Sequence, residues 1–382
     1  MNSAASRHLY PPQQFSGSRR FLRWTVFLVF AALASVGIIS QIYRPSTLRG
    51  LTNRKAKYLS PAELMQRPIS ESLQTIPKLF HQSWSSTDLP AKFGQWSATC
   101  RSQHPDWEWV LWTDEDNEEL VKTHFPWLLK TYQSLPGTIY RADLVRNLYM
   151  YMFGGVYADL DVECLRPVDQ LFDTYNVSTV PHLKTRPHSI DKVHTSGRKA
   201  FFGRMGTDPG FSNSIPNAWM ASTPGHPFFL LVVQSVKDSM GWGSRKGPED
   251  LTGPARLYKM LEEYFTAGKF KGEKLDKHVA SIPTAKQFTP REGLDHSIEV
   301  LPFNNIFPYS WERDGEAVRD VCWATQDTFS AERCKLLLAT EHWPSYAITY
   351  WSHTWAGEGH DEDNVNAISS PEGTEGGNID HD

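Results

Sequence analysis

Residues 139–163 read IYRADLVRNLYMYMFGGVYADLDVE, and this stretch decides how the rest of the chain is interpreted. Apolar residues recur at helical spacing from Ile139 to Phe153, which predicts a helix. Asp143, Arg146 and Asn147 fall together on another face of that helix, three and four residues apart. Gly154-Gly155 ends the helix. From Val156 to Glu163 apolar and polar residues alternate, which predicts a strand.

Two carboxylates of that strand form a candidate metal site. Asp159 and Asp161 point to the same side of a strand, roughly 7 Å apart along the chain. Placed at the strand end, they can hold a hard divalent cation, Mn²⁺ or Mg²⁺, which neutralises a diphosphate leaving group. For Asp143 and Arg146 the alternative is a surface ion pair on an amphipathic helix.

The spacing D-x-D is not specific by itself, because the chain contains it three more times. Asp114 and Asp116 lie in a predicted helix cap, and the other two pairs lie after residue 356. Only Asp159 and Asp161 follow a Gly-Gly break within an apolar strand, where unpaired carboxylates are costly without a cation. The context therefore favours this pair.

The segments before this stretch alternate between strand and helix patterns. Lys78–His81 and Trp107–Trp112 read as strands, and Phe93–Gln103 reads as a helix that stops before Pro105. Thr113 is followed by three acidic residues, which is typical of a helix N-cap and first turn. The β-α-β-α order predicts an α/β domain with a largely parallel sheet.

Composition fits a globular protein with a large core. The chain has 382 residues, of which 40% are hydrophobic and 21% charged. This length allows one large domain or two small ones. The formal net charge is -4, which argues against a nucleic-acid partner. The residues after Ala356 carry eight acids and no Lys or Arg, so the rest of the chain is mildly basic.

The N-terminus predicts a membrane anchor. Trp24–Tyr43 contains no charged residue and is long enough to span a bilayer, and four arginines precede it. A cleaved signal peptide is the alternative, but its apolar region and charged leader would be shorter. A long downstream domain is translocated regardless of nearby charge, which permits a lumenal catalytic domain. The sequon at Asn176 agrees with a lumenal location.

The chain is accordingly divided into five parts. Residues 1–23 are interpreted as a cytoplasmic tail, 24–43 as the transmembrane helix and 44–75 as a stem. Residues 76–356 form the lumenal domain, and 357–382 form a disordered acidic tail. The four cysteines include no C-x-x-C pair, so a structural zinc site is not expected. Cys322 and Cys334 are the preferred disulfide, and four free thiols are the alternative.

From Ile76 to about Phe172 the chain resembles the fungal mannosyltransferase group of glycosyltransferase family 32. The segments that carry the resemblance are IPKLFHQSW (76–84), HPDWEWVLWTD (104–114), YRADLVRNLYMYMFGGVYADLDV (140–162) and CLRPVDQLF (164–172). Three downstream segments are also similar: NAWMASTPGHPF (217–228), TGP (252–254) and YWSHTW (350–355). The resemblance implies a nucleotide-sugar transferase fold with one Rossmann-like, mostly parallel sheet, and retention of anomeric configuration.

The resemblance also implies roles for individual residues. Asp161 is expected to ligate the metal, with Asp159 at the donor ribose or at a metal-bound water. Asp143 and Arg146 are expected to bind the hydroxyls and diphosphate of the donor, which is expected to be GDP-mannose. His353 lies in the C-terminal motif that closes over the diphosphate, and imidazole is an acceptable Mn²⁺ ligand.

Five further residues are assigned to the donor. His81 and Trp84 are expected to border the nucleotide base, and Trp355 to pack against the donor. Gly155 is grouped with the donor-binding residues, and Asn217 is expected near the transferred sugar.

Several of these residues have simpler interpretations. His81 is equally consistent with a hydrogen-bonded core histidine, and Trp84 and Trp355 with core aromatics. Asn217 fits an ordinary helix cap. The metal-ligand role of His353 could belong to a neighbouring histidine such as His342.

The acceptor and compartment stay open at this level. Acceptors in the resembling group include mannose glycans and inositol phosphorylceramide. Lipid-modifying members tend to carry further C-terminal spans, and a second apolar span is not evident here, which slightly favours a glycan. The expected location is the Golgi or endoplasmic reticulum membrane, as a single-pass type II protein. Alternatives are a UDP-sugar donor, a catalytically silent lumenal binding protein and a metal-dependent phosphohydrolase.

Overall fold

The computed structural model describes residues 56–70, 72–182, 196–240, 246–266, 273–284, 288, 295–342 and 344–352. The chain divides into two units, residues 1–54 and 55–382, and the described residues all lie in the second. Within them, no helix has the length and apolar character needed to cross a bilayer. The span predicted at Trp24–Tyr43 and the acidic tail fall outside the described residues, so both stay predictions.

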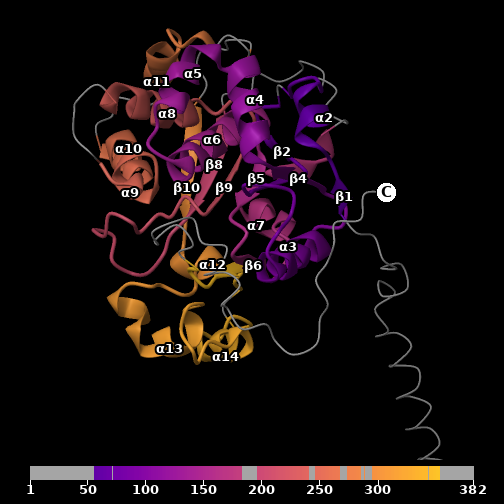
Figure 1. Ribbon diagram of the computed structural model, residues 1–382, viewed down its shortest axis with the longest axis vertical. Coiled ribbons are helices and arrows are strands. Elements are labelled where there is room, and N and C mark those ends of the chain that lie inside the picture. The colour runs from indigo at the N-terminus through magenta and orange to yellow at the C-terminus, as the bar shows by residue number, and fades with distance from the viewer. Residues whose placement is uncertain are drawn as a thin grey trace, which may run out of the picture. The chain divides into compact units, whose positions relative to one another are not determined.

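A seven-stranded sheet forms the centre of the domain (Figure 1). Its strand order is β1 (Lys57–Tyr58), β4 (Glu108–Trp112), β3 (Leu79–Ser83), β5 (Gly155–Ala158), β9 (Trp219–Ser222), β8 (Ser196–Gly203) and β10 (Asp295–Leu301). Neighbouring strands are parallel except for the two pairings of β9, which are antiparallel. The prediction of an α/β domain with a mostly parallel sheet is confirmed.

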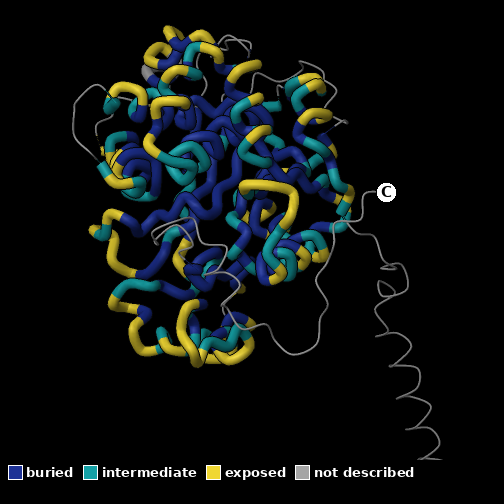
Figure 2. Tube along the Cα trace, viewed as in Figure 1, coloured by how far each residue is buried: buried dark blue, intermediate teal, exposed yellow. Residues whose placement is uncertain are grey.

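Helices cover both faces of this sheet, so the domain has three layers (Figure 1). On one face lie α4 (Asp114–His124), α6 (Thr138–Met152), α8 (Pro227–Ser239), α10 (Pro254–Thr266) and α11 (Glu273–Val279). On the other face lie α3 (Ala91–Gln103) and α7 (Asp169–Thr174). Alternate residues of each strand enter the two cores: Tyr157 packs on the α6 side, and Val156 and Ala158 on the α3 side. The strands are accordingly buried along most of their length (Figure 2).

Two small sheets and several short helices complete the described fold. β6 (Val162–Cys164) pairs antiparallel with β11 (Ala347–Thr349), and β2 (Thr75–Pro77) pairs parallel with β7 (Ser178–Val180). The short helices are α2 (Pro61–Met65), α5 (Leu129–Gln133), α9 (Pro248–Leu251), α12 (Phe303–Ile306), α13 (Arg319–Cys322) and α14 (Ala331–Leu337). Short 3₁₀ helices cover Pro126–Leu128 and Arg313–Val318.

The predicted strand from Val156 to Glu163 is wrong in its continuity. β5 ends at Ala158 and β6 begins at Val162, and the two strands belong to different sheets. Asp159, Leu160 and Asp161 form a turn between them, closed by a hydrogen bond from the Val162 amide to the Asp159 carbonyl. The alternating pattern survives because each short strand buries its own apolar residues, so periodicity alone did not reveal the break.

Two disulfides replace the four free thiols considered above. The predicted Cys322–Cys334 bond is present and joins α13 to α14. A second bond, Cys100–Cys164, joins α3 to β6 across 64 residues of sequence. Closing a loop of that size stabilises the folded state by about 4 kcal/mol in the chain-entropy account. This second bond fixes β6, which directly follows the Asp159–Asp161 turn.

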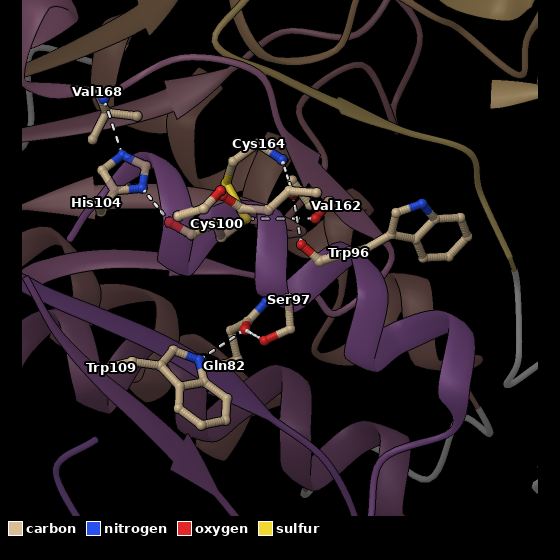
Figure 3. The surroundings of a disulfide bond; sticks show 11 residues. Gln82, Trp96, Ser97, Cys100, His104, Trp109, Val162, Cys164 and Val168 are labelled. Carbon is tan, nitrogen blue, oxygen red and sulfur yellow. Dashed lines mark hydrogen bonds between the residues drawn. A yellow bond between two sulfur atoms is a disulfide. The ribbon is translucent and has the colours of Figure 1, made fainter. Parts of the chain in front are cut away.

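Buried polar groups surround the Cys100–Cys164 bond and are hydrogen-bonded to one another (Figure 3). The amide oxygen of Gln82 accepts from Ser97 Oγ at 2.6 Å and from Trp109 Nε1 at 2.9 Å. His104 accepts from the Val168 amide through Nε2, so its Nδ1 donates to the Cys100 carbonyl at 2.8 Å. Burial lowers the pKa of His104, which is consistent with this neutral tautomer. These bonds join α3, β3 and β4 beneath the site.

The folded domain starts earlier than predicted. Residues 56–75 were assigned to a stem, but Tyr58 lies in β1, and Leu59 and Leu64 are fully buried in the core on the α6 side of the sheet. Arg67 forms an ion pair with Glu108 of β4 at 2.6 Å. The prolines and basic residues of this segment suggested an unfolded linker, because so short a strand and helix produce little periodicity.

A chain that begins at Ser70 should therefore be less stable than one that begins at Lys55. It lacks two leucines that are 0% exposed, and losses of this kind cost ~2–5 kcal/mol each. Urea denaturation of the two chains measures the difference. Within the longer chain, Leu64→Ala should lower the unfolding free energy and Gln66→Ala, at an exposed position, should not. Equal denaturation midpoints for all four proteins would show that residues 56–69 do not contribute to the core.

Candidate active site

A cavity of about 360 Å³ opens where β3 and β5 end. Ser83 and Trp84 border it from the end of β3, Asp159 and Asp161 from the turn after β5, and the first half of α6 forms a further wall. Sites at the carboxyl ends of strands are typical of open α/β sheets. Of the predicted site residues, six line this cavity: Trp84, Asp143, Arg146, Asp159, Asp161 and Asn217.

Arg146 connects the acidic residues of the cavity. Its guanidinium lies 3.2 Å from Asp143 Oδ1 and 3.1 Å from Asp159 Oδ1. It also donates to the backbone carbonyl of Asn217 at 3.0 Å, while the Asn217 side-chain amide donates to Asp143 Oδ1 at 2.8 Å. Asp143 and Arg146 are only 5% exposed each, so the alternative of a surface ion pair is wrong.

Tyr157 contacts both Asp159 and Arg146. Its hydroxyl donates to Asp159 Oδ1 at 2.5 Å, and the Arg146 guanidinium lies 4.7 Å from the centre of its ring. Cation–π contacts of this kind contribute about 0.5–2 kcal/mol, with the higher values in desolvated sites. Tyr157 therefore holds both the acid and its guanidinium partner in place.

The carboxylates of the cavity are incompletely neutralised. Desolvation raises the pKa of Asp143 to about 6, although Arg146 and the hydrogen bond from Asn217 oppose the shift. The pKa of Asp159 is also raised to about 6 by desolvation, again against Arg146, even though 31% of its side chain faces the cavity. Desolvation likewise raises the pKa of Asp161, against its hydrogen bonds from Ser352. One guanidinium thus contacts two of the three enclosed carboxylates, Asp143 and Asp159, and a bound cation would complement the remaining charge.

Ser352 reaches Asp161 from the C-terminal part of the domain. β11 pairs with β6, and the chain then passes the Asp159–Asp161 turn. The Ser352 amide and hydroxyl donate to Asp161 Oδ2 at 3.1 and 2.9 Å. Trp351, with a positive φ of 52°, also lines the cavity.

The donor set suits a divalent metal that retains other ligands. Among the described residues, no group of three or more His, Cys, Asp or Glu side chains is arranged to hold a metal. Asp159 and Asp161 supply two carboxylates on one cavity wall. Mn²⁺ or Mg²⁺ is commonly held by one or two carboxylates, with water and substrate phosphate oxygens completing the shell. The residues present therefore fit a metal that binds together with a phosphate-containing ligand.

Two predicted donor-binding residues lie elsewhere. His81 does not line the cavity: it is 0% exposed and accepts from Trp112 Nε1 through Nδ1, so its Nε2 donates to the Gly154 carbonyl. This placement corresponds to the core-histidine interpretation. Gly155 lies within β5 with φ of 90°, and a Cβ there would be 2.5 Å from the Leu79 carbonyl oxygen. Its role is to permit this close strand approach, because other residues disfavour that φ.

The remaining predicted residues fall into two groups. Asn217 is not a helix cap, because it precedes strand β9 and faces the cavity. His353 and Trp355 lie outside the described residues, so their roles stay predictions. Asp114, which was set aside as a cap residue, does begin α4, but it also lines the cavity. The capping box itself is formed by Thr113 and Asp116.

Sequence analysis did not identify Tyr157, Asn213, Glu249, Trp311 and Ser352 as cavity residues. Tyr157 carried a signal, since it shares a strand face with Asp159. Ser352 also carried a signal, because it lies in the YWSHTW segment directly before His353, the residue predicted as a metal ligand. Asn213 and Trp311 lie in separate loops and Glu249 lies in the short helix α9, and no local pattern marked any of the three.

The segment that contains this site matches a known sugar-transferase region. Residues 90–178 match the family described as "Glycosyltransferase sugar-binding region containing DXD motif". Asp143, Arg146, Asp159 and Asp161 all lie within the matched residues. The similarity to a sugar-transferase region thus covers the segment that carries these four cavity residues.

Among curated proteins, the chain is similar to fungal mannosyltransferases, which confirms the resemblance predicted from the sequence. It is 35% identical over 167 residues to "Inositol phosphoceramide mannosyltransferase 3" of Schizosaccharomyces pombe, covering 44% of this chain and 39% of that protein. It is 32% identical to "Inositol phosphoceramide mannosyltransferase 2" of the same yeast, covering 50% and 47%. It is 26% identical to "Initiation-specific alpha-1,6-mannosyltransferase" of Saccharomyces cerevisiae, covering 44% and 40%. The matched segments thus span less than half the length of these relatives.

A solved structure, "PaToxG Glycosyltransferase", aligns with 56% of this chain and 78% of its own, at 14% sequence identity and a TM-score of 0.35.

The placement of His81 makes stability depend on pH. Burial lowers the pKa of His81 to about 3 in the folded protein, whereas an unfolded histidine titrates near 6.5. Below that pH the unfolded chain binds a proton that the folded protein does not, so the unfolding free energy falls as pH falls. Between pH 7 and 5.5, the unfolding free energy of His81→Gln should therefore fall by about 1 kcal/mol less than that of wild type.

Urea denaturation at the two pH values measures this difference. Gln66→Ala, at an exposed position with no titratable group, is the control and should leave the pH dependence of wild type unchanged. The same pH dependence in wild type and His81→Gln would show that His81 does not stay neutral in the fold.

Proposed function

We propose that the protein is a retaining, metal-dependent glycosyltransferase that transfers mannose from GDP-mannose to inositol phosphoceramide or to a mannose-containing glycan. One observation carries this proposal: Asp143, Arg146, Asp159 and Asp161 converge on a single cavity within a segment that matches a sugar-transferase region. Similarity to proteins named mannosyltransferases supports mannose as the transferred sugar.

The residues divide between metal, diphosphate and sugar. Asp161 and Asp159 would hold Mn²⁺ or Mg²⁺, with His353, which follows Ser352 in sequence, as a further ligand. When bound, the metal would stabilise the negative charge of the leaving diphosphate. Arg146, which contacts Asp159, would bind the same diphosphate.

The sugar would be oriented by Asp143 and Asn217. The hydrogen bond between them, 2.8 Å long, fixes the Asn217 amide beside the Asp143 carboxylate, which Thr252 also contacts. Trp84 would border the base at the end of β3, and Trp355 would pack against the donor. Fixing the donor in this way lowers the entropy cost of the transfer step.

In the transfer step, the acceptor hydroxyl oxygen forms a bond to the anomeric carbon on the face from which the diphosphate leaves. The bond between the anomeric carbon and the β-phosphate oxygen breaks, and its electron pair stays on that oxygen. The proton of the acceptor hydroxyl passes to the departing phosphate. This balance requires no nucleophilic carboxylate and yields a mannoside and GDP.

Inositol phosphoceramide is the preferred acceptor. Relatives named for this lipid match 30–35% of aligned residues over 43–50% of the chain, whereas two initiation-specific mannosyltransferases match 26% over 44% and 30% over 28%. This outweighs the slight preference for a glycan in the sequence analysis. The proposed location is the lumenal side of the Golgi or endoplasmic reticulum membrane, with Trp24–Tyr43 as a type II anchor.

Asp161→Asn should abolish transfer and leave the fold intact. The amide keeps the side-chain volume but removes the charge that would hold the cation, and each 1.36 kcal/mol of lost transition-state stabilisation is tenfold in rate. The measurement is GDP released from GDP-mannose with inositol phosphoceramide or α-mannosides as acceptor, with Mn²⁺ or with chelator. A UDP-hexose is the donor control.

Asp173→Asn, on the exposed face of α7, is the matched control and should turn over like wild type. Asp114 is unsuitable for this purpose because it lines the cavity. Full activity of Asp161→Asn, or of wild type in chelator, would contradict metal-dependent transfer. Binding of GDP-mannose without any GDP release would instead favour a catalytically silent binding protein.

A further inference from the structure

One end of the cavity contains polar groups that the transfer chemistry does not use. Asn213 and Glu249 line the cavity together with Trp311. The Asn213 side-chain nitrogen donates to Glu249 Oε2 at 3.1 Å. The Asn213 Oδ1 atom is buried and has no hydrogen-bond partner, and the residue as a whole is 8% exposed. A buried acceptor of this kind normally has a partner, so it points to a ligand that supplies a donor.

This end adjoins the predicted sugar site. Gly253 separates the two: a Cβ at that position would lie 3.0 Å from Asp143 Oδ2 and 3.0 Å from the Glu249 Cα atom. Asn213 and Asn217 belong to the same segment before β9. The Asn213–Glu249 pair therefore lies beside the Asn217–Asp143 pair. Asp143 is linked to the D-x-D turn through Arg146, and Glu249 lies on the other side of Gly253 from Asp143.

The chemistry of this second pair selects its ligand. Asn213 Oδ1 and the Glu249 carboxylate are hydrogen-bond acceptors, so the bound group must carry donors. An ionised phosphate offers no donors, and Glu249 would repel it. Hydroxyl groups satisfy both oxygens and add no charge.

Trp311 adds an aromatic surface to the lining of the same cavity. The ring is half-buried and packs edge-on against Phe211, with 5.3 Å between ring centres. An aromatic wall beside planar polar groups suits a ring that has apolar C–H faces and a hydroxylated rim.

We propose that Asn213, Glu249 and Trp311 form the acceptor subsite, and that it binds a neutral, polyhydroxylated ring. The hexose of a glycan and the inositol of a lipid headgroup share this chemistry. The inference rests on the proposed function and deepens it, because it separates the residues that recognise the acceptor from those that bind the donor.

The test compares acceptor and donor kinetics in the full chain. Asn213→Ala and Trp311→Ala should raise the acceptor KM ~10- to 100-fold, since each leaves part of the ring without its partner. The GDP-mannose KM and acceptor-independent hydrolysis of GDP-mannose should stay at wild-type values. Inositol phosphoceramide and methyl α-mannoside are assayed in parallel, and the one whose KM rises identifies the ring. Ser212→Ala, at an exposed position of the same segment, is the control.

Glu249→Gln guards against a folding defect. It keeps the side-chain volume and removes only the charge, so its melting temperature should match wild type while the acceptor KM rises. An unchanged acceptor KM in Glu249→Gln and Trp311→Ala would overturn the proposal. So would a rise in the GDP-mannose KM alone, because the subsite would then belong to the donor.

Direct binding separates this inference from the proposed function. Calorimetric titration with methyl α-mannoside and with inositol, in the absence of nucleotide sugar, should show binding to wild type that Trp311→Ala loses. That result in a protein that releases no GDP would support the subsite and contradict the transferase. If wild type releases GDP, and Trp311→Ala binds methyl α-mannoside and inositol as wild type does, the result would support the transferase and contradict the subsite.

Discussion

The candidate site depends on the buried guanidinium of Arg146. It joins three segments that are distant in sequence: its own helix α6 through Asp143, the turn after β5 through Asp159, and the segment before β9 through the Asn217 carbonyl. Removing one partner from such a buried network typically costs ~3–5 kcal/mol, because the remaining charges lose their compensation. Since these three segments supply the acidic wall of the cavity, the placement of its carboxylates depends on this one side chain.

The network leaves an excess of negative charge, and the fold places that excess at one point. Arg146 contacts Asp143 and Asp159, whereas Asp161 is held by the amide and hydroxyl of Ser352, which carry no charge. Charge that the protein does not neutralise favours a cation from outside. This uncompensated carboxylate is the observation that supports the proposed divalent metal.

Covalent and sheet contacts hold the D-x-D turn from behind. The Cys100–Cys164 disulfide joins β6 to α3. Strand β11 pairs with β6 along all three residues of β6, Val162–Cys164. Glu163, the central residue of β6, accepts hydrogen bonds from Lys335 Nζ and from the Tyr350 hydroxyl. These contacts restrict the turn on the side away from the cavity, so a ligand would meet carboxylates whose positions are already fixed.

Sequence alone determined which residues carry charge into the centre of the fold, because helical spacing, a Gly-Gly break and an acid pair within an apolar run are local patterns. It also determined the α/β class and the helix cap at Thr113, since both follow from short-range periodicity. Tertiary structure decided which residues from distant segments contact one another, because local patterns carry no information on such contacts. It placed His81 in the core through a partner 31 residues away, and it split one alternating stretch between two sheets. It also brought Asn213, Glu249, Trp311 and Ser352 to one cavity, because contacts between segments this far apart depend on how the sheet and its two cores pack, and no local spacing records that.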